Sequence, residues 1–254
     1  MFDPFDDFDD KGYLQNALGL KDPADIKEAE HAQFLAQLTE AVEFLAGLEE
    51  ITFEDFLKTH AILFGAFYPT WAGKSRASVL PDKNIDKGDT IFCHPRMVQS
   101  AVEYGLQIAS SSKFKQHAGK AMGQFAFGHP FLDGNGRTML LIHAELCYRA
   151  GFSIDWTRTN KAEYLRALTN EIAKPQEGHL DKYLAPFISE ERIELARWQE
   201  VVMSMPGLDS VDEEPGEATP YDDKVMAQYR QFVDARGGEV PAEQDPDELA
   251  SDGD

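Results

Sequence analysis

The sequence of 254 residues has only two cysteines, no CxxC pair and no run of 18 apolar residues. Two cysteines cannot build a disulfide framework, so Cys93 and Cys147 are expected to be buried apolar groups in a reducing cytoplasm. The first residues are acidic rather than basic and then apolar. We therefore expect neither a signal peptide nor a transmembrane helix, and a cytoplasmic location, with delivery into another cell left open.

Basic residues are also scarce, with 24 Lys and Arg against 45 Asp and Glu and a net charge of -21. A field of this sign repels phosphate backbones and anionic lipid headgroups, so neither nucleic acid nor a membrane surface is expected as a partner. The charge is uneven: residues 1–10 carry -5 and residues 207–254 carry -12, which leaves -4 on residues 11–206. The acidity belongs mainly to the two ends of the chain.

Apolar residues recur at helical spacing along most of the central part of the chain. This spacing predicts helices over 23–48, 52–67, 96–110, 114–128, 135–150, 160–173 and 188–204. Thr52 and Asp55 are spaced as in a capping box. Two β-type runs, Ser78–Leu80 and Thr90–Cys93, lie among Pro and Gly residues and predict a hairpin. The expected fold is an all-α bundle with one inserted β-hairpin.

Both ends of the chain differ in composition from this central part. Residues 1–11 form an acidic tail, and residues 205–254 combine Pro and Gly with many carboxylates. Disorder is the default expectation for most of the second segment. Within it, residues 221–236 space their apolar side chains as an amphipathic helix does, so this stretch could dock on the core or on a partner.

The segment from His129 to Arg137 reads His-Pro-Phe-Leu-Asp-Gly-Asn-Gly-Arg and lies between two predicted helices. Gly134 and Gly136, on either side of Asn135, allow backbone N–H groups to converge at the positive end of the second helix. This arrangement favours an anion such as phosphate. Arg137 supplies a planar fork of donors suited to a second phosphate.

Two further groups of the same segment complete the chemistry. Asp133 offers a hard oxygen of the kind that Mg²⁺ takes when phosphate and water supply its other ligands. His129 is the only nearby residue of a type whose unperturbed pKa permits proton abstraction near neutrality. A lone His before Pro, or a Gly-Asn-Gly turn between helices, is usually structural. The functional interpretation therefore depends on the whole string.

As a whole, the string resembles the Fic family signature HPFx(D/E)GNGR. Flanking segments are also similar to parts of that family: Trp71–Arg76 to its WAGxxR stretch, Phe92–Arg96 to the end of its target-docking flap, Ala150–Trp156 to the segment after the motif helix, and Gly12–Lys21 to the start of shorter Fic toxins. The resemblance covers roughly residues 12–200. It implies a Fic domain over 12–204, with a motif core at about 50–190.

The resemblance implies an enzyme that transfers AMP from ATP, with Mg²⁺, to a Tyr, Thr or Ser hydroxyl of a target protein. His129 would be the general base and Asp133 the Mg²⁺ ligand, with Phe131 as a core anchor. The phosphate-binding residues would be Gly134, Asn135, Gly136 and Arg137, the last of these neutralising the leaving pyrophosphate. A flap made of Thr90, Ile91, Phe92 and Cys93 would offer a strand edge to the target.

One position departs from the family pattern, because the full signature continues to a second Arg where this chain has Leu140. That Arg normally reaches the γ-phosphate, and an apolar side chain cannot replace its charge. Three alternatives stay open: weak AMP transfer, use of another nucleotide or phosphate donor as in protein phosphorylation, and a non-catalytic module that binds nucleotide or a partner. The intact His129 favours activity.

A second departure concerns control. Many Fic proteins carry an inhibitory helix of pattern (S/T)xxxE(G/N), and no segment of this sequence fits that pattern. Either a separate antitoxin-like protein supplies the helix or this control is absent. We favour its absence, because Leu140 removes the Arg with which the inhibitory Glu pairs. A gain of activity on deletion of residues 205–254 would indicate instead that the tail inhibits.

Overall fold

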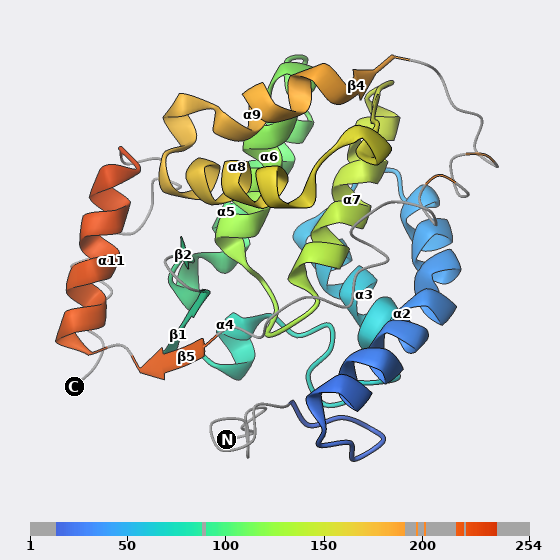
Figure 1. Ribbon diagram of the computed structural model, residues 1–254, viewed down its shortest axis with the longest axis vertical. Helices are drawn as coiled ribbons and strands as arrows, with labels where there is room; N and C mark the ends of the chain where they lie inside the picture. The colour runs from blue at the N-terminus through green and yellow to red at the C-terminus, as the bar shows by residue number, and fades with distance from the viewer. Residues whose placement is uncertain are drawn as a thin grey trace.

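The structure is a computed structural model, and it describes residues 14–87, 90–190, 217–220 and 222–237 together with 197 and 201. It confirms the expected mostly helical fold with a small inserted hairpin (Figure 1). The α-helices are α2 (Pro23–Ala46), α3 (Phe53–Phe64), α4 (Arg76–Val79), α5 (Val98–Ala109), α6 (Ala118–Gly128), α7 (Asn135–Arg149), α8 (Lys161–Ala173), α9 (His179–Leu184) and α11 (Asp223–Ala235).

Short elements connect these helices. The strands are β1 (Lys83–Lys87), β2 (Thr90–Ile91), β3 (Ser153–Ile154), β4 (Ile188–Ser189) and β5 (Glu217–Pro220). The 3₁₀ turns are η1 (Pro95–Met97), η2 (Phe114–Gln116), η3 (Trp156–Arg158), η4 (Pro175–Glu177) and η5 (Ala185–Phe187). Within the described part of the chain, no helix is long and apolar enough to cross a membrane.

The helix starts follow from local capping chemistry. The Asp22 side chain accepts hydrogen bonds from the N–H groups of Ala24 and Asp25, which fixes the start of α2. At the start of α3, the Asp55 carboxylate accepts from the N–H (2.9 Å) and the hydroxyl (2.7 Å) of Thr52. The capping box predicted for these two residues is present.

The two helices that flank the His129–Arg137 segment form the centre of the fold. Every residue of α6 except Lys120 is buried, and most of α7 is buried as well. In Figure 1, α7 runs between α2 and α3 on one side and α6 on the other, and all three helices contact it. Because the segment joins two core helices, its ends are fixed by packing.

The hairpin lies near its predicted position, but its first strand was placed wrongly. Ser78 and Val79 belong to α4, where the Ser75 hydroxyl accepts from the N–H of Ala77 at 3.2 Å. The first strand is β1, in which Ile85 is buried, and β1 pairs antiparallel with β2. A run of only three residues is compatible with either helix or strand, so the cap at Ser75 decided between them.

Two other predicted segments also differ from the structure. Ile188 and Ser189, expected to start a helix over 188–204, form β4 and pair with β3, and most of the remainder lies outside the described residues. The acidic segment 1–11 and most of 205–254 lie outside them too. In the stretch where apolar spacing predicted a tail helix, α11 is present, preceded by β5, which pairs with β1.

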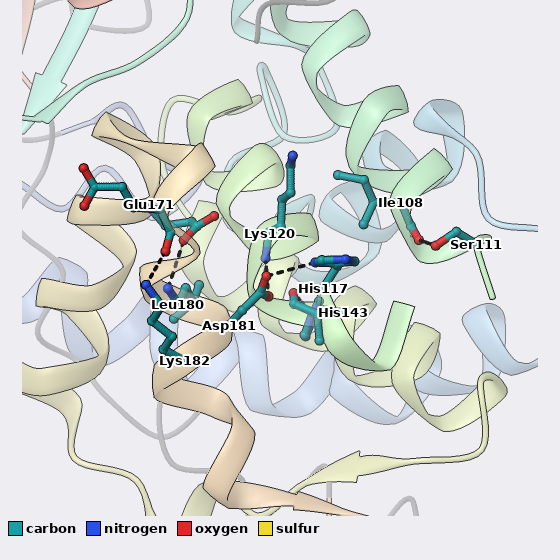
Figure 2. Close-up of polar contacts among 11 residues, drawn as sticks. Ile108, Ser111, His117, Lys120, His143, Glu171, Leu180, Asp181 and Lys182 are labelled. Atoms are coloured by element: carbon teal, nitrogen blue, oxygen red, sulfur yellow. Dashed lines mark hydrogen bonds and ion pairs between the residues drawn. The ribbon is translucent and has the colours of Figure 1, made fainter. Parts of the chain in front are cut away.

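A close contact between α6 and α9 fixes the start of α6, as Figure 2 shows. The Asp181 carboxylate on α9 accepts from the Lys120 N–H at 2.9 Å and lies 3.2 Å from Nδ1 of His117. Gly119 makes this approach possible, because a Cβ at this position would lie 2.3 Å from the backbone nitrogen of Asp181. The contact depends on a position without a side chain.

Gly119→Ala is expected to destabilise the protein by about 3 kcal/mol, because the added methyl group meets the backbone of α9 rather than a movable side chain. Gly47→Ala is the matched control, since the nearest atom to its added Cβ lies at 3.5 Å and its φ is -80°. Urea unfolding of both variants measures the difference. Equal stability of the two variants would show that α6 and α9 can separate at little cost.

Candidate functional site

The candidate site is the turn between α6 and α7, and it begins with an unusual backbone conformation. His129 ends α6 in the left-handed region with φ 42° and ψ 61°, and among the described residues no other non-glycine residue has a positive φ. Such a conformation is costly for histidine and persists only when surrounding contacts enforce it. The contacts around His129 are therefore the first property of the site to explain.

Arg76 supplies one set of these contacts. Its side chain is completely buried, its Nε donates to the His129 carbonyl at 2.8 Å, and its Nη2 donates to the Gly128 carbonyl at 3.2 Å. The same Nη2 also donates to the Cys93 carbonyl at the end of the flap. One guanidinium thus joins the end of α6 to the flap.

Sequence reasoning assigned no role to Arg76, although this residue ends the Trp71–Arg76 stretch. A single Arg in a sequence is usually exposed. The signal that could have identified Arg76 was its position at the end of a flanking motif.

The imidazole of His129 lies beneath the flap and next to α7. The Phe92 ring stacks on it with centroids 3.8 Å apart and an interplanar angle of 15°. Nδ2 of Asn135 lies 3.2 Å from Nε2 of His129. Since an amide nitrogen can only donate, Nε2 is in its proton-accepting form. That form is the one a general base requires, although the His129 side chain is only 5% exposed.

Asn135 was predicted to hold phosphate, and in this structure its side chain is used inside the turn. Its Oδ1 accepts from the Phe131 N–H and its Nδ2 donates to the Phe131 carbonyl, both at 2.8 Å. These two bonds close the loop around Phe131, which is fully buried as the expected core anchor. Any contact of residue 135 with an anion would come through its backbone N–H.

The geometry of an anion cradle is present at the start of α7. Gly134 precedes the helix with φ 71°, and a Cβ there would lie 2.6 Å from the Phe64 ring. The first-turn N–H groups of a helix have no partner within the helix, which here concerns Asn135, Gly136 and Arg137. With the positive end of the helix dipole they favour an anion at this point.

Asp133 lies half-exposed beside this cradle, and its Oδ1 accepts from the Gly134 N–H at 2.7 Å. No group of three or more metal-ligating side chains occurs among the residues that the structure describes. Mg²⁺ is commonly held by one or two carboxylates together with substrate phosphates. A single carboxylate next to a phosphate cradle therefore fits Mg²⁺ bound with nucleotide.

His60, which the sequence did not single out, supports the turn from α3. The Gly73 N–H donates to its Nδ1 at 2.9 Å, so Nε2 carries the proton and donates to the Asp133 carbonyl at 2.9 Å. Its ring stacks on Phe131 with centroids 3.8 Å apart. Burial lowers the pKa of His60 to about 3, so this histidine is a neutral support.

Arg137 points to α2 and forms a buried ion pair that the sequence did not predict. Its Nη2 donates to Glu30, whose other oxygen accepts from the Tyr68 hydroxyl at 2.7 Å. The guanidinium lies 5.2 Å from the centroid of the Phe34 ring and 4.7 Å from that of Phe64. In this structure Nη2 of Arg137, a residue expected to neutralise a leaving pyrophosphate, is engaged by Glu30.

Glu30 carries the electrostatic cost of this arrangement. Burial, first, and the nearby Asp133 carboxylate raise its pKa, while Arg137 and Tyr68 lower it, and the net result is a pKa of about 7. A position-by-position motif search could not find Glu30, because 107 residues separate it from Arg137.

The predicted flap residues are divided by the structure. Thr90 and Ile91 are half-exposed in β2, whereas Phe92 and Cys93 are buried. The Cys93 N–H donates to the Phe127 carbonyl at 2.9 Å, so this residue cannot offer its N–H to a target strand. Leu140, at the position of the missing second Arg, is buried and 7% exposed.

Comparisons with known proteins agree with this geometry. Residues 50–147 match the model of the Fic/DOC family. The chain is 32% identical over 175 residues to the protein adenylyltransferase VbhT of Bartonella schoenbuchensis, which covers 65% of this chain and 35% of VbhT. It thus matches about a third of the length of VbhT. It is also 24% identical over 170 residues to the probable protein adenylyltransferase y4lH of Sinorhizobium fredii, covering 63% of this chain and 83% of that protein.

Solved structures show the same fold. BepC of Bartonella tribocorum, crystallised with AMPPNP, has a TM-score of 0.60 and 17% identity, covering 72% of this chain and 95% of that one. A Fic domain of Bartonella quintana with bound ADP has a TM-score of 0.58 and 18% identity, covering 72% and 93%. At these identities the likeness concerns the fold.

Arg137→Met is expected to destabilise the protein by about 3 kcal/mol at pH 8, because it leaves the Glu30 carboxylate buried without its cation. Removal of Arg137 raises the pKa of Glu30 further. When the pKa of a carboxyl group is higher in the folded than in the unfolded state, the protein becomes less stable as the pH rises through the folded-state pKa. The destabilisation caused by Arg137→Met should therefore be smaller at pH 5 than at pH 8.

Urea unfolding at both pH values measures this effect. Arg166→Met, at an exposed position on α8, is the control and should change stability by less than about 0.5 kcal/mol at either pH. An equal loss at pH 5 and pH 8 for Arg137→Met would show that Glu30 does not carry the effect.

Proposed function

Because this chain is a Fic/DOC family protein, we propose that it is a protein adenylyltransferase, which transfers AMP from ATP to a Tyr, Thr or Ser hydroxyl of another protein. The observation that carries the proposal is the α6–α7 turn, where His129, with Nε2 in its accepting form, adjoins an anion cradle and the Asp133 carboxylate. Nucleotidyl transfer needs mainly positioning, charge neutralisation and a base, and this turn offers all three.

The chain's own residues would act as follows. A target hydroxyl takes the place of the Asn135 amide at Nε2 of His129 and gives its proton to that nitrogen. The oxygen then bonds to the α-phosphorus of ATP, and the bond from that phosphorus to the β-phosphate oxygen breaks, so pyrophosphate leaves. The first-turn N–H groups of α7 hold the phosphates. Mg²⁺, held by Asp133, would neutralise charge on the phosphates.

Protein is the proposed partner, in line with the flap. The hairpin sheet has the order β2-β1-β5, so among the described strands none pairs with the outer edge of β2. An extended target segment can add to such an edge through backbone hydrogen bonds.

The reducing cytoplasm is the proposed compartment, since both Cys93 and Cys147 are free and buried.

A second candidate function rests on Leu140. A buried leucine where the family signature has its second Arg offers nothing to a γ-phosphate. The alternative is transfer from another nucleotide or phosphate donor, including phosphorylation of the target.

The test that separates these functions uses ATP labelled at either the α- or the γ-phosphate, incubated with the chain, Mg²⁺ and a cell lysate. Protein labelled from the α-position only is the result expected for AMP transfer, and label from the γ-position would favour phosphorylation. No label from either position would favour a module that binds nucleotide without transferring it.

His129→Ala and His129→Asn are both expected to lower labelling at least 100-fold, because each removes the general base. Asn tolerates the left-handed backbone, so it separates loss of the base from loss of the turn.

Leu140→Arg is expected to lower the KM for ATP about tenfold if a missing charge–phosphate hydrogen bond limits ATP use. Leu140→Gln is the matched control, because it also replaces a buried leucine with a long polar side chain but adds no charge. Initial rates at varied ATP measure both. An unchanged KM in the Arg variant, with its fold intact by circular dichroism, would exclude the missing clamp as the limiting defect.

A further inference from the structure

In this structure the flap covers the side chain of His129, the candidate base. Phe92 and His129 are 4% and 5% exposed, and their rings stack at 3.8 Å. Asn135 engages the one ring nitrogen that is ready to accept a proton. A target hydroxyl must come within about 3 Å of that nitrogen, so Phe92 has to move before His129 can act on a protein.

The C-terminal segment holds the flap along one edge. β5 pairs with β1 through four residue pairs, from Lys83 with Pro220 to Asp86 with Glu217. The pairing of β1 with β2 extends over only two pairs. Figure 1 shows β5 lying beside β1 at the margin of the fold. The longer of the two pairings that stabilise the hairpin therefore comes from the tail.

The helix that follows holds the other end of the flap. The Tyr229 hydroxyl on α11 accepts from the His94 N–H at 3.1 Å and donates to the Met97 sulfur at 3.3 Å. His94 is two residues from Phe92, and Tyr229 is 1% exposed. A movement that lifts Phe92 away from His129 pulls on this contact.

The tail helix is itself anchored on the core helices α6 and α8. Arg236 is completely buried, donates to the Ile172 carbonyl at the end of α8, and lies 3.6 Å from the centroid of the Phe127 ring of α6. Val233 is also buried. Because this anchor lies on α6 and α8, the contact at Tyr229 connects the flap to the rigid part of the molecule.

We propose that β5 and the segment 222–237, which contains α11, form a latch that keeps the flap closed, with Phe92 as the gate over His129. This regulation rests on the proposed function, since it controls access of a protein hydroxyl to His129. The latch acts on the flap through backbone pairing and one tyrosine, and it needs no acidic residue opposite the phosphate cradle. Activation then consists of releasing β5 and α11 from the flap.

The test is Tyr229→Phe in the full chain, which removes the hydroxyl that accepts from His94 and keeps the ring. Loss of one such hydrogen bond should raise the population of the open flap about fivefold. The first readout is the rate at which diethyl pyrocarbonate modifies His129, resolved from the other histidines by mass spectrometry. The second readout is transfer of label from ATP to protein. Both rates are expected to rise about fivefold.

Tyr183→Phe is the matched control, because the Tyr183 hydroxyl also accepts from a backbone N–H, that of Asn160 at 2.9 Å, but lies between α8 and α9. It should leave the modification of His129 unchanged. Val233→Asp is a second latch variant, expected to detach α11 by placing a charge at a buried position. Circular dichroism shows whether Val233→Asp is folded. If it is not, the test is decided by Tyr229→Phe alone.

The outcomes distinguish the latch from the transferase. Faster modification of His129 in the latch variants supports the latch even if no protein becomes labelled, and that combination counts against the proposed function alone. Unchanged modification of His129 in Tyr229→Phe and in folded Val233→Asp would overturn the latch. A fall in protein labelling with unchanged modification would also overturn it, because the tail would then support the flap rather than close it.

Discussion

The Arg76 guanidinium lies completely buried where three chain segments meet, and its N–H groups donate to the carbonyls of Gly128, His129 and Cys93. A charge without solvent is tolerated only when it is hydrogen-bonded, and carbonyls at the end of a helix need donors from outside the helix. Here the buried guanidinium obtains its hydrogen bonds from the same carbonyls that need donors. The left-handed turn at His129, the end of the flap and α4 are held in one arrangement as a result.

Other buried polar groups extend this arrangement through the turn. His60 holds the Asp133 carbonyl, Asn135 closes the loop on Phe131, and Glu30 with Tyr68 holds Arg137. An irregular backbone segment inside a core must satisfy its polar groups with side chains, because no helix or strand does so. Several side chains of the motif therefore hold the turn in its conformation. The groups suited to bind phosphate and a metal ion are the backbone N–H groups at the start of α7 and the Asp133 carboxylate.

The C-terminal tail changes how the flap is understood. Its composition favours disorder, yet Tyr229 and Arg236 are buried against the flap and the core. Average charge does not reveal such contacts, because a few apolar side chains and one planar cation can secure a short helix that is acidic elsewhere. Strand β1 of the hairpin is thus the middle strand of a three-stranded sheet, whose third strand, β5, lies about 130 residues further along the chain.

The sequence predicted the helices well wherever apolar spacing and a cap agreed, as at Thr52, because both are local properties. It was ambiguous at Ser78–Leu80, where three residues are too few to separate helix from strand. It also pointed to the segment from His129 to Arg137 as the candidate site, because these residues are contiguous and their chemistry depends on residue type, but it did not point to Arg76 or Glu30.

What the sequence determined by itself is the fold family and the chemical groups in the turn. Only the tertiary structure decided what those groups contact. Arg137 meets Glu30 across 107 residues and Tyr229 meets His94 across 135. Such contacts depend on how helices and strands pack in three dimensions, and neither periodicity nor capping carries that information, because both describe only neighbours along the chain.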